Sequence, residues 1–180
     1  MDNQTQQMSE ADEDALMQRA ALGDEHAMGR LYGLVANALY TYLRRLGCDA
    51  NTADDVLQTT FLNAWRSRER FRGDGARAWL FVIARNAWFK QRQGNKDDRH
   101  LQIVSSAPAT PSEQFTATDL ARRVDQALSQ LEASQREAII LSRVSGLSTR
   151  EIARILEISE SNVRVRVHRG LAKLKETVLS

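Results

Sequence analysis

The sequence has little cysteine and no long apolar run, and these scarcities exclude two classes of protein. Its one cysteine, Cys48, cannot form an internal disulfide, so a disulfide-stabilised domain is excluded and a reducing cytoplasm is expected. No apolar run reaches the ~18 residues that a membrane-spanning helix needs, which predicts no membrane insertion. The acidic, polar start, MDNQTQQMSEADEDAL, also lacks the basic and apolar segments of a signal peptide.

Proline is almost as scarce, and its two copies lie close together. Both fall within SSAPATPSEQFTATD, residues 105–119, a segment rich in serine, threonine and alanine. Because proline interrupts helices, a chain that confines it to one place is predicted to be helical on both sides of that place. We therefore expect an all-α fold with two helical domains, residues 1–96 and 119–180, joined by a flexible linker at 97–118.

Residues that carry catalysis or bind metals are also few. The three histidines, His26, His100 and His168, are isolated, and no cluster with metal-ligand spacing occurs. The sequence has no glycine-rich phosphate loop and no nucleophile spaced from a base as a catalytic pair requires. We therefore predict that the chain is not an enzyme and uses no metal and no cofactor.

Charge is nearly balanced overall but unevenly placed along the chain. The net charge is +2; acidic residues dominate the first thirty positions, and basic residues gather at 66–99 and 143–175. Two separate basic regions are typical of a protein that contacts a polyanion such as DNA. Solvated basic helix faces would explain the charge alone equally well.

Apolar residues at three- and four-residue spacing predict four helices before the linker. These are expected at residues 10–22, 25–46, 51–69 and 76–93. Asn51 or Thr52 is the expected N-cap of the third helix. That cap would place Asp54 and Asp55 in the first turn, beside the positive end of the helix dipole.

The fourth of these helices combines aromatic and basic residues. Phe81, Trp88 and Phe89 lie opposite its expected core stripe, interleaved with Arg85 and Arg92. Single-stranded nucleic acid is bound by this combination, because bases stack on aromatic rings while arginines neutralise the backbone. Packing of the same aromatic residues against neighbouring helices is the alternative.

Four shorter helices are predicted after the linker. The sequences SQRE at 134–137 and STRE at 148–151 match the capping box, in which the serine caps the helix and the glutamate reaches back. Gly146 is well placed to end one helix, and Ser159 to cap the last. Two helices joined by the short turn at 157–158 predict a helix-turn-helix unit.

Residues 162–169 read NVRVRVHR, an alternation that is typical of a half-buried strand. A helix at about 100° per residue accounts for more of the sequence, because one apolar stripe then continues past the alternating segment. That stripe consists of Val163, Val167, Leu171, Leu174 and Val178. The remaining face is basic, which favours a recognition helix that meets phosphates and base edges; a solvated basic surface is the alternative.

Three segments of the chain resemble one protein family. LSQLEASQREAIILSRVSGLSTREIARILEISESNVRVRVHRGLAKLKE, residues 128–176, strongly resembles the C-terminal DNA-binding domain of bacterial extracytoplasmic-function (ECF) sigma factors. DDVLQTTFLNAW at 54–65 and FRGDGARAWLFVIARNAW at 71–88 are similar to the N-terminal domain of that family. The resemblance implies a sigma-70 region 2 domain and a four-helix, winged-helix-like region 4 domain that carries the helix-turn-helix.

The resemblance also implies the function and the partners. A sigma factor of this group binds core RNA polymerase through the β′ clamp helices and the β flap, and directs it to promoter DNA. It opens the minus-ten element and reads the minus-35 element as duplex. An anti-sigma factor is a plausible further partner in this family.

Individual site residues follow from the matching positions of the motifs. The resemblance assigns polymerase binding to Asp54, Asp55 and Gln58. It assigns minus-ten DNA binding to the loop Phe71, Arg72, Gly73 and Asp74, and to Asn86. The aromatic and basic face of the same helix adds Arg85 and Trp88 to this expected site. The resemblance matches Arg164 and Arg169 to basic positions of the minus-35 recognition helix. Ser161, Val165 and His168 of the same helix complete the residues expected to bind minus-35 DNA.

Two positions depart from the family pattern. Thr59 follows the glutamine of the polymerase-binding motif where the family usually has an acidic residue, which puts one clamp contact in doubt. Glu157 stands where the family's turn often has glycine, so a different turn shape is expected. One rival interpretation is a stand-alone helix-turn-helix regulator, which needs neither the aromatic and arginine-rich helix nor the DDVLQ segment. The other is a protein-only adaptor whose basic faces only keep it soluble.

Overall fold

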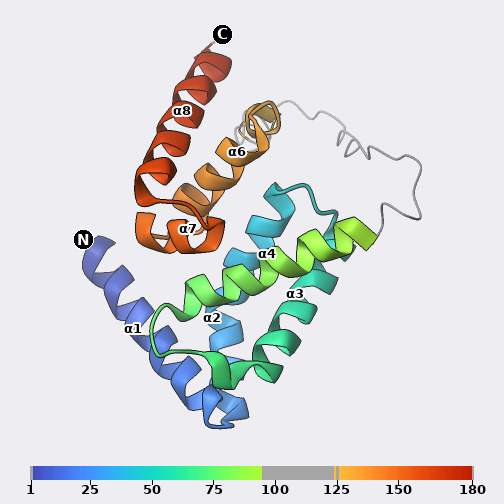
Figure 1. The fold of residues 1–180 in the computed structure, drawn as a ribbon, viewed down its shortest axis with the longest axis vertical. Coiled ribbons are helices and arrows are strands. Elements are labelled where there is room, and N and C mark those ends of the chain that lie inside the picture. Colours follow the sequence, from blue (N-terminus) through green and yellow to red (C-terminus); the bar gives the residue numbers. More distant parts are fainter. Residues whose placement is uncertain (1, 95–123, 125, 180) are drawn as a thin grey trace, which may run out of the picture.

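The computed structural model describes residues 2–94, 124 and 126–179, and within them every regular element is helical (Figure 1). The N-terminal elements are α1 (Asp2–Ala21), α2 (Glu25–Arg45), α3 (Ala50–Arg66), the 3-10 helix η1 (Arg68–Arg70) and α4 (Ala76–Gly94). The C-terminal elements are α6 (Ala133–Ile139), the π-helix η2 (Ile140–Val144), α7 (Thr149–Leu156) and α8 (Glu160–Leu179). The predicted all-α fold is confirmed, while the expected linker lies outside the described residues.

Aspartates are the N-caps of two of the N-terminal helices. The carboxylate of Asp24 accepts from the Ala27 amide at 3.0 Å, and that of Asp49 accepts from the Thr52 amide at 2.9 Å. The prediction of Asn51 or Thr52 as the cap of α3 was therefore wrong. Because α3 begins earlier than expected, the two aspartates of its polymerase-binding motif lie beyond the first turn, where the helix dipole acts less on them.

Two of the predicted caps in the C-terminal half are confirmed. Ser148 and Glu151 form the reciprocal capping box at the start of α7. The Ser159 hydroxyl accepts from the Asn162 amide at 3.2 Å and caps α8. Residues 162–169 lie inside α8, so the helical interpretation of the alternating segment is correct.

The capping box expected at residues 134–137 does not form. The helix α6 begins at Ala133, and the Ser134 hydroxyl donates to Glu132 at 2.7 Å instead of capping a backbone amide. Glu137 does not reach back to the helix start, because its side chain points into the protein and is bonded to Tyr42. The sequence pattern was right about the helix and wrong about the role of its glutamate.

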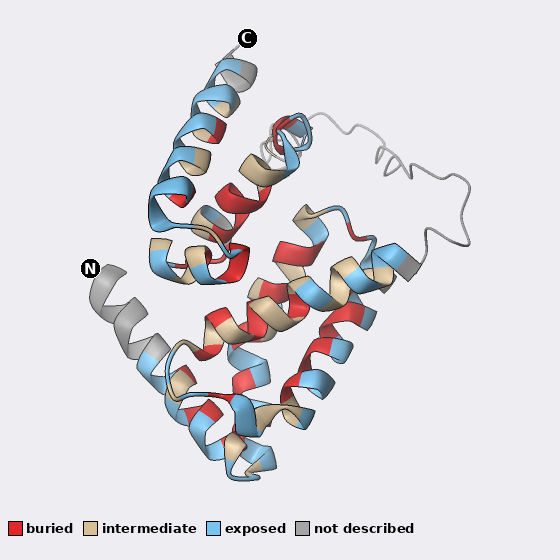
Figure 2. Cartoon of the chain, viewed as in Figure 1, coloured by how far each residue is buried: buried red, intermediate tan, exposed pale blue. Residues whose placement is uncertain are grey.

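One apolar core extends through both halves of the chain (Figure 2). Leu39 of α2, Leu80 of α4 and Ile152 and Ile155 of α7 belong to the same buried cluster. In keeping with this, α7 contacts α4, and η2 contacts α2. A smaller cluster contains Leu128, Leu131 and Ile139, with Val124, Leu171 and Leu174 packed on it. The C-terminal helices therefore pack directly against the N-terminal helices.

The described residues contain no helix that is both long enough and apolar enough to cross a bilayer.

Candidate polymerase and nucleic-acid interfaces

The outer face of α3 carries the residues assigned to polymerase binding. Asp54, Asp55 and Gln58 are all exposed, while the intervening apolar residues face the core. Leu62 lies one turn beyond Gln58 and is 56% exposed. At about 100° per residue, Asp55, Gln58 and Leu62 fall within roughly 60° of one another around the helix. This face thus combines a carboxylate, an amide and an apolar side chain.

Thr59 lies beside that face and is exposed as well. Its neighbour Thr60 is buried and donates its hydroxyl to the Val56 carbonyl at 2.7 Å, so the two threonines have different environments. The departure from the family pattern therefore falls on the surface, where threonine replaces a carboxylate without disturbing the core.

The loop before α4 is fixed by side chains of α1. The Asp14 carboxylate accepts from the backbone amides of Gly75 and Ala76, at 3.1 and 2.6 Å, and thereby satisfies the first free amides of α4. The Gln18 amide donates to the Gly73 carbonyl at 2.9 Å, and Gly73 has a φ of +97°, which favours glycine. The loop assigned to minus-ten DNA is thus held by contacts from α1, outside its own sequence.

A second acidic residue of α1 anchors α4 itself. Glu13 is 1% exposed, and its carboxylate accepts from both Nε and Nη2 of Arg77, with the Nε contact at 2.9 Å. The acidic N-terminal segment had been interpreted only as a charge asymmetry. Two of its carboxylates in fact position the loop and the helix assigned to minus-ten DNA.

The four loop residues differ in exposure. Phe71 is buried and packs against Trp79, with ring centroids 5.7 Å apart. Arg72 and Asp74 are exposed. The loop therefore presents one cation and one carboxylate at the surface, while its aromatic residue supports them from within.

The residues on α4 fall into three environments. Asn86 is exposed, and Trp88 is half-buried with the Arg92 guanidinium 6.0 Å from its ring centroid. Phe81 is fully buried against Tyr42, with ring centroids 5.2 Å apart. For Phe81 the packing interpretation is correct, because no part of its ring is accessible to a base.

Arg85 is bound within the protein. Its Nε donates to Glu137 at 2.8 Å, and its guanidinium lies 4.8 Å from the Phe89 ring centroid. Burial by itself would lower the pKa of Arg85, but the hydrogen bond to Glu137 and the attraction of that carboxylate, followed by Tyr42 and Glu157, outweigh burial and raise it. A guanidinium in this setting is charged and already paired.

The helix-turn-helix turn keeps the backbone conformation that glycine would adopt. Glu157 has a φ of +55° and a ψ of +43°, in the left-handed region, and its amide donates to the Ala153 carbonyl. Side chains other than glycine are strained there by about 1–2 kcal/mol. The expected change of turn shape is therefore wrong, and the departure from glycine appears as local strain.

All five residues assigned to minus-35 DNA are exposed on α8. These are Ser161, Arg164, Val165, His168 and Arg169. Val163, on the opposite side, is 1% exposed and packs in the core. Arg164 forms an ion pair with Glu160 at 3.0 Å, one turn earlier on the same helix, and Val165 is 43% exposed. The face thus offers cations, hydroxyl and imidazole donors, and one apolar side chain.

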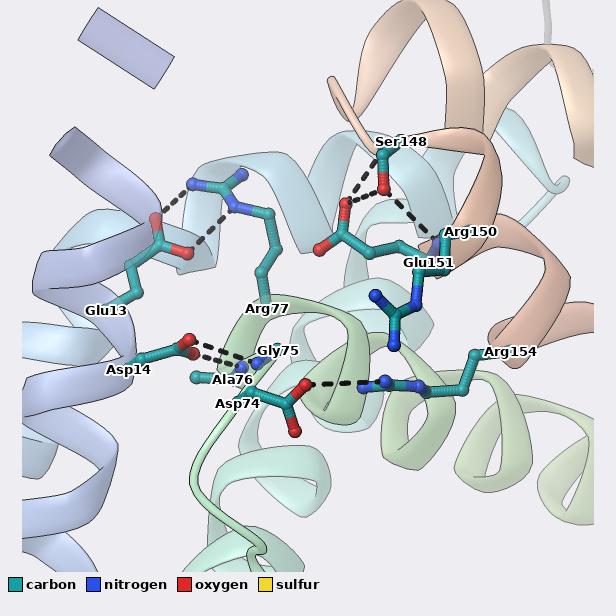
Figure 3. A pocket seen from close by; sticks show the side chains of 10 residues that line it. All are labelled: Glu13, Asp14, Asp74, Gly75, Ala76, Arg77, Ser148, Arg150, Glu151 and Arg154. Atoms are coloured by element: carbon teal, nitrogen blue, oxygen red, sulfur yellow. Dashed lines mark hydrogen bonds and ion pairs between the residues drawn. The ribbon is translucent and has the colours of Figure 1, made fainter. Parts of the chain in front are cut away.

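A polar cleft lies between α1, the start of α4 and α7 (Figure 3). Asp74 and Arg154 point toward one another across it, with 3.7 Å between the carboxylate and the guanidinium. No group of three or more metal-ligating side chains occurs among the described residues. The cleft therefore contains a contact between the two halves of the chain and no metal-binding cluster.

Sequence reasoning missed the residues whose partners are distant along the chain. Glu13 and Asp14 were given no role, Tyr42 had no predicted role beyond an apolar helix face, and Glu137 was assigned to a cap. For the first two, a signal did exist, since acidic residues next to an apolar helical stripe can face a neighbouring helix. For Tyr42 and Glu137, separated by 95 positions, no local pattern indicates the pairing.

Comparison with known proteins identifies the family to which both halves of the chain belong. The family described as Sigma-70 region 2 matches residues 31–96, and Sigma-70, region 4 matches residues 121–174. The chain is 37% identical over 169 residues to the ECF RNA polymerase sigma factor SigL of Mycobacterium tuberculosis, covering 88% of this chain and 93% of SigL.

Two solved structures have the same fold. One is CnrH in complex with the cytosolic domain of CnrY, with a TM-score of 0.73, 29% identity, and coverage of 93% of this chain and 97% of CnrH. The other is the sigma factor RpoE in complex with the anti-sigma factor NepR from Bartonella quintana, with a TM-score of 0.69, 32% identity, and coverage of 83% and 95%. The chain therefore belongs to the ECF RNA polymerase sigma factors of the sigma-70 family, initiation factors that bind core RNA polymerase and direct transcription initiation without being enzymes.

Proposed function

We propose that this sigma factor binds polymerase and the two promoter elements through three separate surfaces. The outer face of α3 binds the β′ clamp helices, the loop before α4 together with α4 binds the minus-ten element, and the exposed face of α8 reads the minus-35 element. The observation that carries the proposal is the face of α8, where five residues of DNA-binding chemistry are exposed together opposite a buried stripe. A solvated helix would need no such combination of donors, cations and an apolar contact.

On α8, the proposed contacts to the bases of the duplex are of two kinds. Arg164 and Arg169 supply the fork of donors that guanine accepts in the major groove, and Ser161 and His168 supply single hydrogen bonds. Residues in the first turns of a recognition helix are the ones that reach base edges. Ser161, Arg164 and Val165 all lie within the first two turns of α8.

On α4 and its loop, Asn86 is the base-reading residue and Arg72, Arg85 and Trp88 support it. Asn86 is exposed and offers both a donor and an acceptor to a base edge. Arg72 and Arg85 neutralise the backbone of the opened strand, and Trp88 offers a stacking surface at the edge of the core. Asp74 and Phe71 complete the loop, the first at the surface and the second as its support.

We further propose an anti-sigma factor as a regulatory partner. RpoE of Bartonella quintana, to which the chain is similar over most of its length, was solved with the anti-sigma factor NepR. A partner that covers the same surfaces in this chain would prevent holoenzyme assembly.

The polymerase surface is tested by reversing the charge of Asp55. Asp55→Lys should lower the affinity for core polymerase by at least tenfold, because an attraction across an interface becomes a repulsion. The melting temperature should hardly change, since Asp55 is exposed and lies beyond the first turn of α3. Asp54→Lys should give a related but smaller defect, because adjacent helix residues point about 100° apart and only one of the two need face the clamp squarely.

The measurements are a core-polymerase pull-down and a thermal melt of each variant, with a DNA shift of the chain alone beside them. Normal core binding by Asp55→Lys would contradict the assignment of this surface. A shift of specific DNA by the chain alone, without core enzyme, would favour the activity of a stand-alone regulator.

A further inference from the structure

The position of Glu137 in α6 does not explain why its carboxylate is buried. It is 7% exposed, and carboxylates are seldom buried unless they are paired, because removing the charge from water is costly. Two donors from the N-terminal half converge on one of its oxygens: the Tyr42 hydroxyl at 2.8 Å and the Arg85 Nε at 2.8 Å. The local capping role is absent, so the carboxylate serves the contact between the two halves.

The environment of Tyr42 shows that this contact is shielded from solvent. Tyr42 is fully buried, and its pKa is raised well above the ordinary value, chiefly by burial and then by the neighbouring Glu137 carboxylate. Its hydroxyl thus remains protonated and donates to that carboxylate. Two donors from different helices fix the position of Glu137.

The partner that matters for function is Arg85. A guanidinium binds a carboxylate and a phosphate with the same arrangement of donors. In the closed chain its Nε is bonded to Glu137, its planar group lies over Phe89, and the side chain is 27% exposed. The group proposed to neutralise the opened strand is therefore already bonded to a carboxylate of the C-terminal half.

Other contacts hold the same two halves together. Between them lies the shared apolar core, to which Ile152 and Ile155 of α7 and Leu80 of α4 contribute. Asp74 and Arg154 form a more distant ion pair whose side chains are 70% and 43% exposed (Figure 3). An exposed pair of this kind contributes little. Among these described cross-contacts, the Glu137 bonds are the buried polar ones.

The two promoter elements are too far apart for the closed chain. Elements centred near minus-ten and minus-35 are about 25 base pairs apart, or about 85 Å at 3.4 Å per base pair. A compact chain of this length has a radius of gyration of about 16 Å, hence a diameter of about 40 Å. Both DNA-reading surfaces therefore reach their elements only after the two halves have separated.

We propose that Glu137 is an internal competitor of promoter DNA for Arg85, a proposal that rests on the proposed role of Arg85 at the minus-ten element. In the closed chain the carboxylate stands where a DNA phosphate binds, and it holds α6 against α2 and α4. Separation of the halves releases Glu137 and frees the Arg85 guanidinium for the opened strand. Glu137 thus sets how readily the sigma factor engages the minus-ten element.

The test compares two variants that break the same ion pair from opposite sides. Glu137→Gln keeps the size of the side chain but removes its charge, and Arg85→Ala removes the guanidinium. Both should increase the radius of gyration of the free chain in small-angle scattering. In a holoenzyme assay at limiting sigma factor, Glu137→Gln should raise the yield of open promoter complex about threefold to tenfold, the range for the loss of one typical hydrogen bond. Arg85→Ala should lower that yield.

Glu132→Gln is the control, since Glu132 lies in the same C-terminal half as Glu137, just before α6, and is exposed. It should change neither the scattering nor the yield. A purely structural ion pair predicts that both Glu137→Gln and Arg85→Ala lower the yield, and that result would overturn the proposal. Unchanged scattering and yield in Glu137→Gln would overturn it as well.

The role of Arg85 itself is tested separately. If Arg85→Ala opens promoters normally, the assignment of Arg85 to the minus-ten element fails, and the competition fails with it. A defect in Arg85→Ala combined with no gain in Glu137→Gln overturns the competition alone. Should Glu137→Gln unfold, Tyr42→Phe removes only one of the two bonds; it should give a smaller gain in yield, and the absence of any gain would again overturn the proposal.

Discussion

The two helices proposed to read promoter DNA differ in how much of their reading surface is free before DNA binds. On α8, the five assigned side chains are exposed, and the ion-pair partner of Arg164 is Glu160 on the same helix. On α4, Arg85 is bonded to the buried Glu137 of the other half of the chain, and Trp88 is half-buried. The minus-35 surface is thus ready in the free chain, while part of the minus-ten surface is engaged internally.

Under the proposed competition, one binding surface is regulated by the half of the chain that carries the other. The proposed partner of α8 is duplex DNA, whose shape needs no prior opening, so an exposed reading face on α8 has no cost. The aromatic and basic face of α4 suits any single strand, and an exposed face of that kind binds nucleic acid without sequence preference. We propose that the internal pairing of Arg85 reduces such binding until the holoenzyme has formed.

The largest expected effect is a difference in the free energy of unfolding between arginine variants of α4 and those of α8. Arg85→Ala should lower the free energy of unfolding by about 2–3 kcal/mol, because it leaves the buried Glu137 without its cation; the partial exposure of Arg85 places this near the low end for a broken buried pair. Arg164→Ala and Arg169→Ala should change the free energy of unfolding by less than about 0.5 kcal/mol. Each should instead weaken binding of minus-35 DNA by about 1–3 kcal/mol.

Denaturant titration and holoenzyme binding to minus-35 duplexes give the two quantities. Equal losses of stability for Arg85→Ala and Arg169→Ala would contradict the difference between the helices. Unchanged minus-35 binding in both α8 variants would contradict the recognition-helix assignment.

A smaller effect concerns Val165, the exposed apolar residue on α8. The 5-methyl group of thymine is the apolar feature of the major groove, and a valine methyl group fits against it. Replacing one thymine of the minus-35 element by uracil should weaken binding to the wild type by about 1 kcal/mol, the value of one buried methyl group. The same replacement should have no effect on Val165→Ala. Equal sensitivity of both proteins at every thymine would contradict the contact.

The turn before α8 offers a gain of stability. Glu157→Gly should raise the free energy of unfolding by about 0.5–1 kcal/mol, since glycine relieves the left-handed strain but loses more entropy on folding. Glu157→Gln is the matched control, because it removes the same charge and keeps the strain. Thermal melts of both variants separate strain from charge; an equal gain in the two would show that the conformation of Glu157 is without cost.

The smallest effect at neutral pH concerns Cys48, which is buried between α2 and α3. Burial, with a smaller contribution from Asp49, raises the pKa of its thiol to about 12. The unfolded chain releases this proton at a lower pH than the folded chain, so stability is unaffected below about pH 9 and falls above it, by up to about 1.4 kcal/mol per pH unit. Cys48→Ala should flatten that alkaline decline in melts between pH 8 and pH 11, and an unchanged slope would contradict the burial effect.

Much of the fold was predictable from local sequence. The helices of both halves, the caps at Ser148 and Ser159, and the helical nature of residues 162–169 follow from spacing within a few residues. The structure confirms them for the residues that it describes. The exposed face of α8 was predictable for the same reason, because one helix alone decides which side chains share its surface.

The remaining features depend on contacts between distant segments. Phe81 and Phe89 look alike in the sequence, yet only Phe81 packs on Tyr42 in the core. Glu137 fits a capping box as well as Glu151 does, yet its carboxylate is bonded 52 and 95 positions away. A pattern of a few residues cannot rank a local cap against a buried partner on another helix, because the second choice depends on tertiary packing.

Arginine-specific chemical modification of the free chain with phenylglyoxal, followed by peptide mass spectrometry, compares the two DNA-facing helices residue by residue. We expect Arg169 to react at the rate of an exposed arginine and Arg85 to be protected at least tenfold, because its guanidinium is bonded to Glu137 and covered by Phe89. In Glu137→Gln, the protection of Arg85 should largely disappear while the rate at Arg169 stays the same. Modification of Arg85 as fast as Arg169 in the unaltered chain would contradict the internal engagement of the minus-ten surface.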